Sequence, residues 1–429
     1  MPILHLAKTI ITNNGEPIVD GGLLIEGSKI IQTGKKEDFG SSENTKIIDR
    51  GNSLICPGFI NLHAHLLYSK VEKTNGENGL FGWLENLTDK VISFSNLELV
   101  NSVNHGINEA LSCGTTFIVE NTPSEISVKE LSKSHLKALI GLEVFGSDEE
   151  KANEIFILAN SYLENLQDKY QNLDFTFSPH APYDVSAPLW RKLVTWAEEN
   201  NKFLLTHLEE SHEEKKWWQE KSGPGVNFWE KINKLEPKLK YWKKYKSGID
   251  FLSKNDSLNQ NLIAAHLCEA DEEDLRVIKA KNIKLIHCPR SNFYLNNSTA
   301  NLRLWNELGF LWGIGTDSLA SNKDLDLLHE IKFTMKQQEL TSGFKISAKE
   351  AFEAITINAS KILKKENEIG ALKKGSCADF LIFNTEKLSN TYNNPYDLVI
   401  SSLETKEDLK EVWINGKQAW LSKSLLPKI

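Results

Sequence analysis

Three histidines and one aspartate have the types and spacing needed to hold a metal ion. His63 and His65 are one residue apart, so in a β-strand both side chains point to the same face. With His207 and Asp317 they offer three imidazoles and one carboxylate. That set suits a divalent transition metal and leaves room for a water. We therefore expect His63, His65, His207 and Asp317 to be metal ligands.

Eight short apolar runs, each ending in polar residues, carry these side chains. Most are nearly continuous in Val, Ile, Leu and Phe, which is typical of parallel strands buried on both faces. Segments with helical periodicity separate them, so the pattern predicts an α/β fold, a (β/α)₈ barrel. The runs are Gly58–His65, Thr115–Asn121, Ala138–Phe145, Asp174–His180, Phe203–Glu209, Asn261–His266, Ile283–Cys288 and Leu311–Asp317.

In such a barrel the active site lies at the carboxyl ends of the strands. Six of the eleven histidines and one aspartate stand at these ends. Random placement would not gather them there, so we expect one site on one rim. The seven residues are His63, His65, His180, His207, His266, His287 and Asp317.

The two ends of the chain have a different texture from the middle. Residues 1–57 and 366–429 contain short alternating stretches with Gly and Asn turns, which predict a small composite β-sandwich beside a barrel of residues 58–365. An aromatic-rich insertion at about 211–260 interrupts the barrel. Insertions of this length are often lids or binding elements, and helices that pack on the barrel are the alternative.

Net charge, hydropathy and cysteine content indicate which partners and which cell compartment to expect. A net charge of −8 argues against nucleic acid or an anionic membrane as partner, and leaves a small-molecule substrate. No apolar run reaches the ~18 residues of a membrane helix, and no signal peptide is evident. Five scattered cysteines without CxxC spacing are typical of reduced thiols, so we expect a cytoplasmic protein. The oligomeric state, a homo-oligomer included, stays open.

The residues at the strand ends resemble those of the amidohydrolase superfamily, in its branch of metal-dependent deaminases and chlorohydrolases. The resemblance covers nearly the whole chain and implies a barrel with a flanking sandwich. The similar stretches are Pro57–His65 (PGFINLHAH), Ser178–Tyr183 (SPHAPY), Thr206–Glu210 (THLEE), Ala265–Leu267 (AHL), His287–Asn292 (HCPRSN), Gly315–Asn322 (GTDSLASN) and Ile369–Phe383 (IGALKKGSCADFLIF).

This resemblance implies one divalent metal per chain, Zn²⁺ or Fe²⁺, because the fourth strand ends without the lysine that bridges two metals in other members. Asp317 would ligate the metal and accept a proton from water, and His266 would orient the attacking water. Glu210, in the position of the family's HxxE glutamate, would protonate the ring nitrogen. Strict strand alternation favours Glu209 for this role instead.

Four further residues are candidates for substrate binding. Trp83 resembles an aromatic wall of the base pocket, or packs in the core. His180 would contact substrate, or hold a loop. Arg290 could pair with a substrate carboxylate, or form a rim salt bridge. Asn292 matches a motif position for substrate contact, or shapes its turn.

Within the branch the chain most resembles aminodeoxyfutalosine deaminases, which implies hydrolysis of the 6-amino group of an adenine nucleoside in the futalosine route to menaquinone. Deaminases of S-adenosylhomocysteine and methylthioadenosine are the next resemblance. Hydrolysis of another amino- or chloro-substituted ring remains open on the same scaffold, and a non-catalytic assembly protein is a remote alternative.

Overall fold

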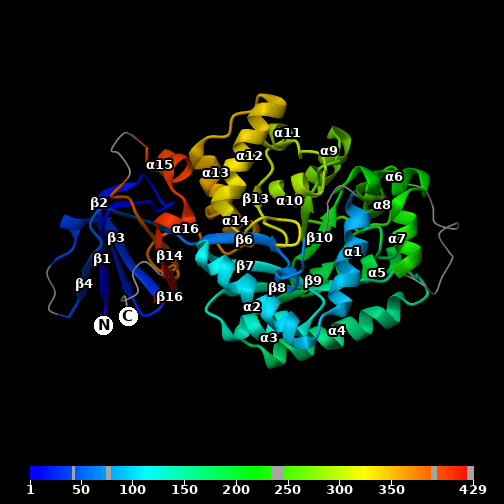
Figure 1. Cartoon of the computed structure of the whole chain (residues 1–429), viewed down its shortest axis with the longest axis horizontal. Helices are drawn as coiled ribbons and strands as arrows, with labels where there is room; N and C mark the ends of the chain where they lie inside the picture. The colour runs from blue at the N-terminus through cyan, green and yellow to red at the C-terminus, as the bar shows by residue number, and fades with distance from the viewer. Residues whose placement is uncertain (41–43, 74–78, 233–244, 388–393, 423–429) are drawn as a thin grey trace.

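The computed structural model describes residues 1–40, 44–73, 79–232, 245–387 and 394–422. Two sheets organise this part of the chain. Figure 1 shows the sheet built from both chain ends on the left and the parallel sheet with its helices on the right. Among the described residues no helix is long and apolar enough to cross a membrane.

The parallel sheet is a closed barrel. Its strands pair in chain order from β6 to β13, and a parallel bridge between Ala64 and Asp317 joins the last strand to the first. All eight predicted strands are therefore confirmed. They are β6 (Phe59–Ala64), β7 (Thr115–Thr122), β8 (Lys137–Val144), β9 (Asp174–Pro179), β10 (Leu204–Leu208), β11 (Leu262–His266), β12 (Lys284–His287) and β13 (Trp312–Ile314).

A glycine permits this closure. A Cβ atom on Gly315 would lie 2.5 Å from the Cβ atom of His63, so only glycine lets the end of β13 approach β6 this closely. The backbone N–H groups of Thr316 and Asp317 donate to the carbonyl oxygen of His63 at 3.1 and 3.0 Å. Asp317 is thereby held beside the first strand.

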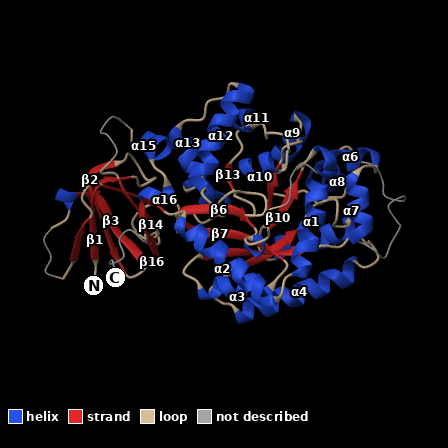
Figure 2. Ribbon diagram, viewed as in Figure 1, coloured by secondary structure: helices blue, strands red, loops and turns tan. Residues whose placement is uncertain are grey.

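Helices cover the outside of the barrel (Figure 2). In α5 (Ala187–Glu199) a proline stands in the first turn, where its missing N–H costs nothing, and Leu189, Trp190, Leu193 and Ala197 bury one stripe. The other barrel helices are α1 (Gly79–Ser93), α2 (Asn96–Ser112), α3 (Glu125–Lys133), α4 (Ala152–Lys169), α9 (Glu272–Ala280), α10 (Pro289–Tyr294), α11 (Leu302–Glu307), α12 (Leu327–Ser342), α13 (Ala348–Ala354) and α14 (Ile357–Ile362), with the 3₁₀ turn η2 (Leu66–Tyr68).

The second sheet is mixed and joins both ends of the chain, as predicted. Strand β1 pairs with β2, β4 and β5, and β5 pairs with β14 from the C-terminal part. Its inward side chains, including Ile10, Leu23 and Phe380, form a hydrophobic cluster separate from the barrel core. The elements are β1 (Ile3–Ile10), β2 (Ile18–Glu26), β3 (Lys29–Lys35), η1 (Lys36–Asp38), β4 (Lys46–Asp49), β5 (Ser53–Pro57), β14 (Phe380–Asn384), α15 (Pro395–Ser402), α16 (Thr405–Asp408), β15 (Leu409–Ile414) and β16 (Lys417–Leu421).

The aromatic-rich insertion forms α6 (His212–Glu220), α7 (Pro224–Ile232) and α8 (Gly248–Lys254); its residues 233–244 lie outside the described residues. Trp217 and Trp218 are buried, which fits the packing alternative for this part. Phe228 of α7, however, lines the cavity described below. The insertion therefore both packs on the barrel and contributes to a wall of the site.

Candidate functional site

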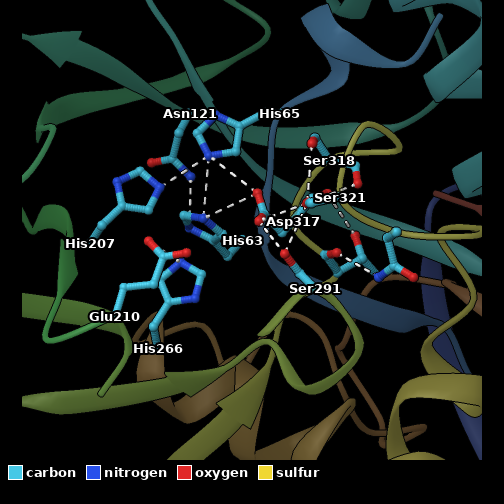
Figure 3. Close-up of polar contacts among 12 residues, drawn as sticks. His63, His65, Asn121, His207, Glu210, His266, Ser291, Asp317, Ser318 and Ser321 are labelled. Carbon is cyan, nitrogen blue, oxygen red and sulfur yellow. Dashed lines mark hydrogen bonds and ion pairs between the residues drawn. The ribbon is translucent and has the colours of Figure 1, made fainter. Parts of the chain in front are cut away.

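The four predicted ligands meet inside the barrel rim (Figure 3). Nε2 of His65 lies 3.3 Å from Nε2 of His63 and 3.2 Å from Nε2 of His207. Oδ1 of Asp317 lies 3.6 Å from Nε2 of His65 and 3.9 Å from that of His63. Ligand nitrogens about 3.3 Å apart are expected around a tetrahedral Zn²⁺ with Zn–N bonds of about 2.0–2.1 Å. The donor set therefore fits a divalent metal.

Neighbouring groups orient these ligands. Nδ1 of His207 donates to the backbone oxygen of His180 at 2.8 Å, which leaves a lone pair on its Nε2. Nδ1 of His63 lies 3.1 Å from the side-chain amide of Asn121. Ser291 and Ser321 donate their hydroxyls to Oδ2 of Asp317 at 2.6 and 3.0 Å, so that Oδ1 faces the histidines. These contacts are the outer shell that a metal site needs.

The protonation states of the candidate ligands also favour binding of a metal cation. Burial, with the neighbouring imidazole of His65, holds the pKa of His63 well below its ordinary value, and burial lowers the pKa of His207 in the same way. Although burial opposes ionisation, the His65 and His63 imidazoles lower the pKa of Asp317 to about 2. Neutral imidazoles and an ionised carboxylate are the forms that ligate metals.

Three strand ends have left-handed backbone geometry. Glu209, His266 and Asp317 have φ angles of 49°, 78° and 58°. Each such non-glycine residue costs about 1–3 kcal/mol and persists only where its surroundings enforce it. Glu209 follows β10, His266 ends β11 and Asp317 follows β13, so the strain lies at the same strand ends as the candidate site.

This backbone turn separates Glu209 from Glu210. Oε1 of Glu209 accepts from the backbone N–H of Ile249 at 3.2 Å, away from the cavity. Glu210 lines the cavity, and Oε2 of Glu210 lies 3.7 Å from Nε2 of His266. The alternation that favoured Glu209 is broken by its positive φ angle. Burial raises the pKa of Glu210, which favours its protonated form.

His266 has a defined orientation. Its Nδ1 lies 2.8 Å from Oδ1 of Asn292, so Nδ1 carries the hydrogen and Nε2 is free to accept. Nε2 is buried and has no hydrogen-bond partner among the described residues. His266 also lies with His63 and His207 in a group whose nitrogens are within 4.8 Å of one another. Asn292 was predicted to contact substrate; it lies outside the cavity lining and orients His266 instead.

A cavity of about 360 Å³ opens beside these groups. Its lining combines polar groups, among them three of the four candidate ligands, with a larger set of apolar side chains. The polar groups are His65, Glu143, His180, Asp184, His207, Glu210, Asp317 and Ser318. The apolar walls are lined by Tyr68, Leu80, Trp83, Leu84, Leu87, Val91, Ile92, Phe145, Tyr183 and Phe228, with Thr88 and Gly146.

Trp83 and His180, two predicted substrate contacts, line this cavity. Nε1 of Trp83 is buried without a hydrogen-bond partner among the described residues. Nδ1 of His180 lies 2.6 Å from Oδ2 of Asp184. Despite the opposing effect of burial, this carboxylate raises the pKa of His180 to about 9, so the cavity wall carries an imidazolium at neutral pH.

Arg290 is placed differently from the prediction. Its guanidinium pairs with Asp324 at 2.6 Å and with Glu330 at 3.4 Å, and its side chain is 13% exposed. It is absent from the cavity lining. The expected pairing with a substrate carboxylate is therefore corrected to an ion pair inside the protein, the alternative weighed for it.

Several site residues were not singled out from the sequence. Glu143 is the last residue but one of β8, and its Oε1 lies 3.7 Å from Nδ1 of His65. Asn121 is the last residue but one of β7 and lies beside His63. Both lie at carboxyl ends of predicted strands, so a polar residue in that position was the available signal. His287, in contrast, is fully buried, outside the cavity, and burial lowers its pKa to about 3.

Comparisons with known proteins agree with this geometry. The sequence model of the amidohydrolase family matches residues 54–419. A 5-methylthioadenosine/S-adenosylhomocysteine deaminase of Caldicellulosiruptor saccharolyticus is 27% identical over 94% of this chain and 90% of its own length. Among solved structures, Helicobacter pylori aminofutalosine deaminase in complex with methylthio-coformycin has a TM-score of 0.81 at 24% identity, covering 97% of this chain and 99% of its own. A zinc-bound adenosine deaminase from Xanthomonas campestris has a TM-score of 0.81 at 18% identity, covering 100% and 94%. The two solved structures establish the fold.

Proposed function

Because the chain belongs to the amidohydrolase family and is a hydrolytic deaminase, we propose that it removes the 6-amino group of an adenine-containing nucleoside. The observation that carries this proposal is the cavity, whose lining joins residues of a metal-binding group and a buried glutamate to apolar side chains. A purine ring needs such a combination, since one edge must react while both faces are covered by apolar side chains.

We assign His63, His65, His207 and Asp317 as ligands of one divalent metal. When bound, the metal would supply an activated water at neutral pH. Nε2 of His266, whose ring is held by Asn292, would orient the attacking water, and Asp317 would accept a proton from it. Glu210, whose pKa is raised by burial, would donate a proton to the ring nitrogen beside the amino-bearing carbon as the water oxygen bonds to that carbon. As the C–N bond breaks, the proton taken up by Asp317 would pass to the amino group, which leaves as ammonia, and the remaining hydroxyl proton would return to Glu210.

The apolar walls select the substituent on the ribose. Leu84, Leu87, Val91 and Ile92 of α1 extend from Trp83 along one side of the cavity. An uncharged group at the 5′ position, such as the methylthio group of methylthioadenosine, matches this wall, since its burial releases water from apolar surface on both sides. The relative from C. saccharolyticus is named for this substrate and for S-adenosylhomocysteine.

Aminodeoxyfutalosine, the substrate first expected, is the second candidate. Its aromatic ring would pack on the same apolar wall. The guanidinium of Arg290 is already paired with Asp324 and Glu330. The carboxylate of aminodeoxyfutalosine would therefore have to reach solvent instead of this guanidinium. A role in menaquinone synthesis therefore depends on the substrate measurement.

The test is a deamination panel with the purified metal-loaded enzyme, following the adenine-to-hypoxanthine absorbance change and ammonia release. It compares methylthioadenosine, S-adenosylhomocysteine, aminodeoxyfutalosine, adenosine and guanine. We expect kcat/KM for methylthioadenosine at least about tenfold above adenosine, since each buried apolar group adds about 1–3 kcal/mol. A hundredfold preference for aminodeoxyfutalosine would move the enzyme to the futalosine route. Turnover of chloro-substituted rings alone would refute the deaminase proposal.

A further inference from the structure

A second hollow, of about 480 Å³, lies on the molecule outside the active cavity. Its basic residues come from four separate parts of the chain, and we call it the basic hollow. Lys70 and Lys73 follow η2, His105 belongs to α2, Lys323 follows the last barrel strand and Lys406 belongs to α16. Ser69, Val71, Glu109 and Leu319 complete the lining.

The charge of the basic hollow is not balanced by its own acids. Glu109 is the one acid in the lining, and it pairs with Lys406 at 2.9 Å. The ammonium groups of Lys70 and Lys323 form no ion pair with any residue that the structure describes, and that of Lys73 lies 5.7 Å from the ring centre of Tyr294. In a chain of net charge −8, this is a local concentration of positive charge.

These like charges repel one another. Burial, the nearby Arg290 guanidinium and the Lys323 ammonium lower the pKa of Lys73, although the Asp324 carboxylate acts in the opposite direction. An anion between the lysines would relieve this repulsion and accept several charge-assisted hydrogen bonds. Oγ of Ser69, buried in the same lining, also lacks a hydrogen-bond partner among the described residues.

The basic hollow shares a wall with the active cavity. Tyr68 and Ser318 line the cavity, whereas their chain neighbours Ser69 and Leu319 line the hollow. The wall therefore consists of the segment that follows His65 and the segment that follows Asp317. A ligand held by Lys70 and Lys323 would tie these two segments together.

We propose that the basic hollow binds a small phosphate-bearing anion, and that this anion joins the segments after His65 and Asp317. A phosphoryl group offers several acceptor oxygens, and the hollow is lined by several lysines that can donate to them. The site is distinct from the active cavity, and its occupancy is measured as binding, without reference to turnover.

The experiment is calorimetric titration of the metal-loaded enzyme with inorganic phosphate at low ionic strength. We expect one site per chain, and at least tenfold weaker binding in the double variant Lys70→Ala/Lys323→Ala. The control variant Lys129→Ala/Lys349→Ala, which removes two exposed lysines from α3 and α13, should bind as the wild type does. Phosphate should also raise the Tm of the wild type and not that of the Lys70/Lys323 variant.

The absence of phosphate binding, equal affinity in the Lys70/Lys323 variant, or an equal loss in the control would overturn the proposal. Equal affinity would place the phosphate elsewhere, for example at the metal. A second titration with ribose 5-phosphate tests the source of the anion. If ribose 5-phosphate binds more tightly than inorganic phosphate, the ligand is a phosphorylated metabolite, and if it does not, the ligand is free phosphate.

Discussion

Glu209 and Glu210 are chain neighbours with different surroundings. Both are buried, yet Glu209 accepts a backbone hydrogen bond from Ile249, while Glu210 faces His266 and the cavity. The positive φ angle of Glu209 interrupts the alternation of side chains along the strand. Glu210 therefore faces the cavity, where strict alternation would have placed Glu209. We therefore propose Glu210, rather than Glu209, as the residue that transfers a proton to substrate.

The substitution Glu210→Gln should lower kcat by about 10²–10⁴-fold, because glutamine keeps the shape of the side chain but cannot transfer the proton. Metal content, measured by elemental analysis, should be unchanged. Glu209→Gln is the matched control: its amide oxygen can still accept from Ile249, so kcat should fall less than about tenfold. An active Glu210→Gln enzyme beside an inactive Glu209→Gln enzyme would reverse the assignment.

Helix α1 is the element that shapes the apolar part of the cavity. Its first residue, Gly79, has a φ angle of +72°, and a Cβ atom there would lie 2.3 Å from Oε1 of Glu213 on α6. Oε2 of Glu213 accepts from the backbone N–H of Phe81 at 3.1 Å and so caps the first turn of α1. The insertion thus holds the helix that carries Trp83.

Glu213→Ala should therefore weaken substrate binding more than chemistry. Loss of a cap costs about 1 kcal/mol, so we expect KM to rise about fivefold with kcat within about twofold. Steady-state kinetics with the best substrate of the panel measures both. Lys216→Ala, at an exposed position on the same helix, is the control and should leave KM unchanged. An equal rise in both variants would assign the effect to α6 as a whole.

At the scale of the whole molecule, barrel closure and the metal site depend on each other. The bridge between Ala64 and Asp317 that closes the barrel also brings the carboxylate to the histidines of β6. A metal held by side chains from the first, fifth and eighth barrel strands would cross-link the sheet around its circumference. A metal that binds the folded chain and not the unfolded one would stabilise the fold.

Removal of the metal by chelation and dialysis should abolish turnover and lower the Tm. At free metal about 1,000 times its Kd, the stabilisation is about 4 kcal/mol. Thermal denaturation of apo and reloaded enzyme, with elemental analysis, should give one equivalent per chain and recovery of both Tm and activity. His207→Ala should lack the metal-dependent rise in Tm. Two equivalents per chain, or no change in Tm, would contradict the single-metal site.

The sequence by itself determined the barrel and its eight strands, and it predicted the four candidate ligands that the fold brings together. Strand periodicity and the position of polar residues after each apolar run are local properties, and in a parallel barrel every carboxyl end reaches the same rim. Both chain ends were likewise predictable as strands of one composite β-structure, expected as a small sandwich and found as a mixed sheet, because their alternating pattern is local too.

Tertiary structure decided the contacts that lie between segments. The φ angle that turns Glu209 away, the partners that occupy Arg290, and the role of Asn292 behind His266 depend on residues 26 to 40 positions away or on backbone strain. No periodicity encodes such pairings, since they are set by how closed strands and helices pack. For the same reason the basic hollow, built from four distant parts of the chain, is visible only in the folded molecule.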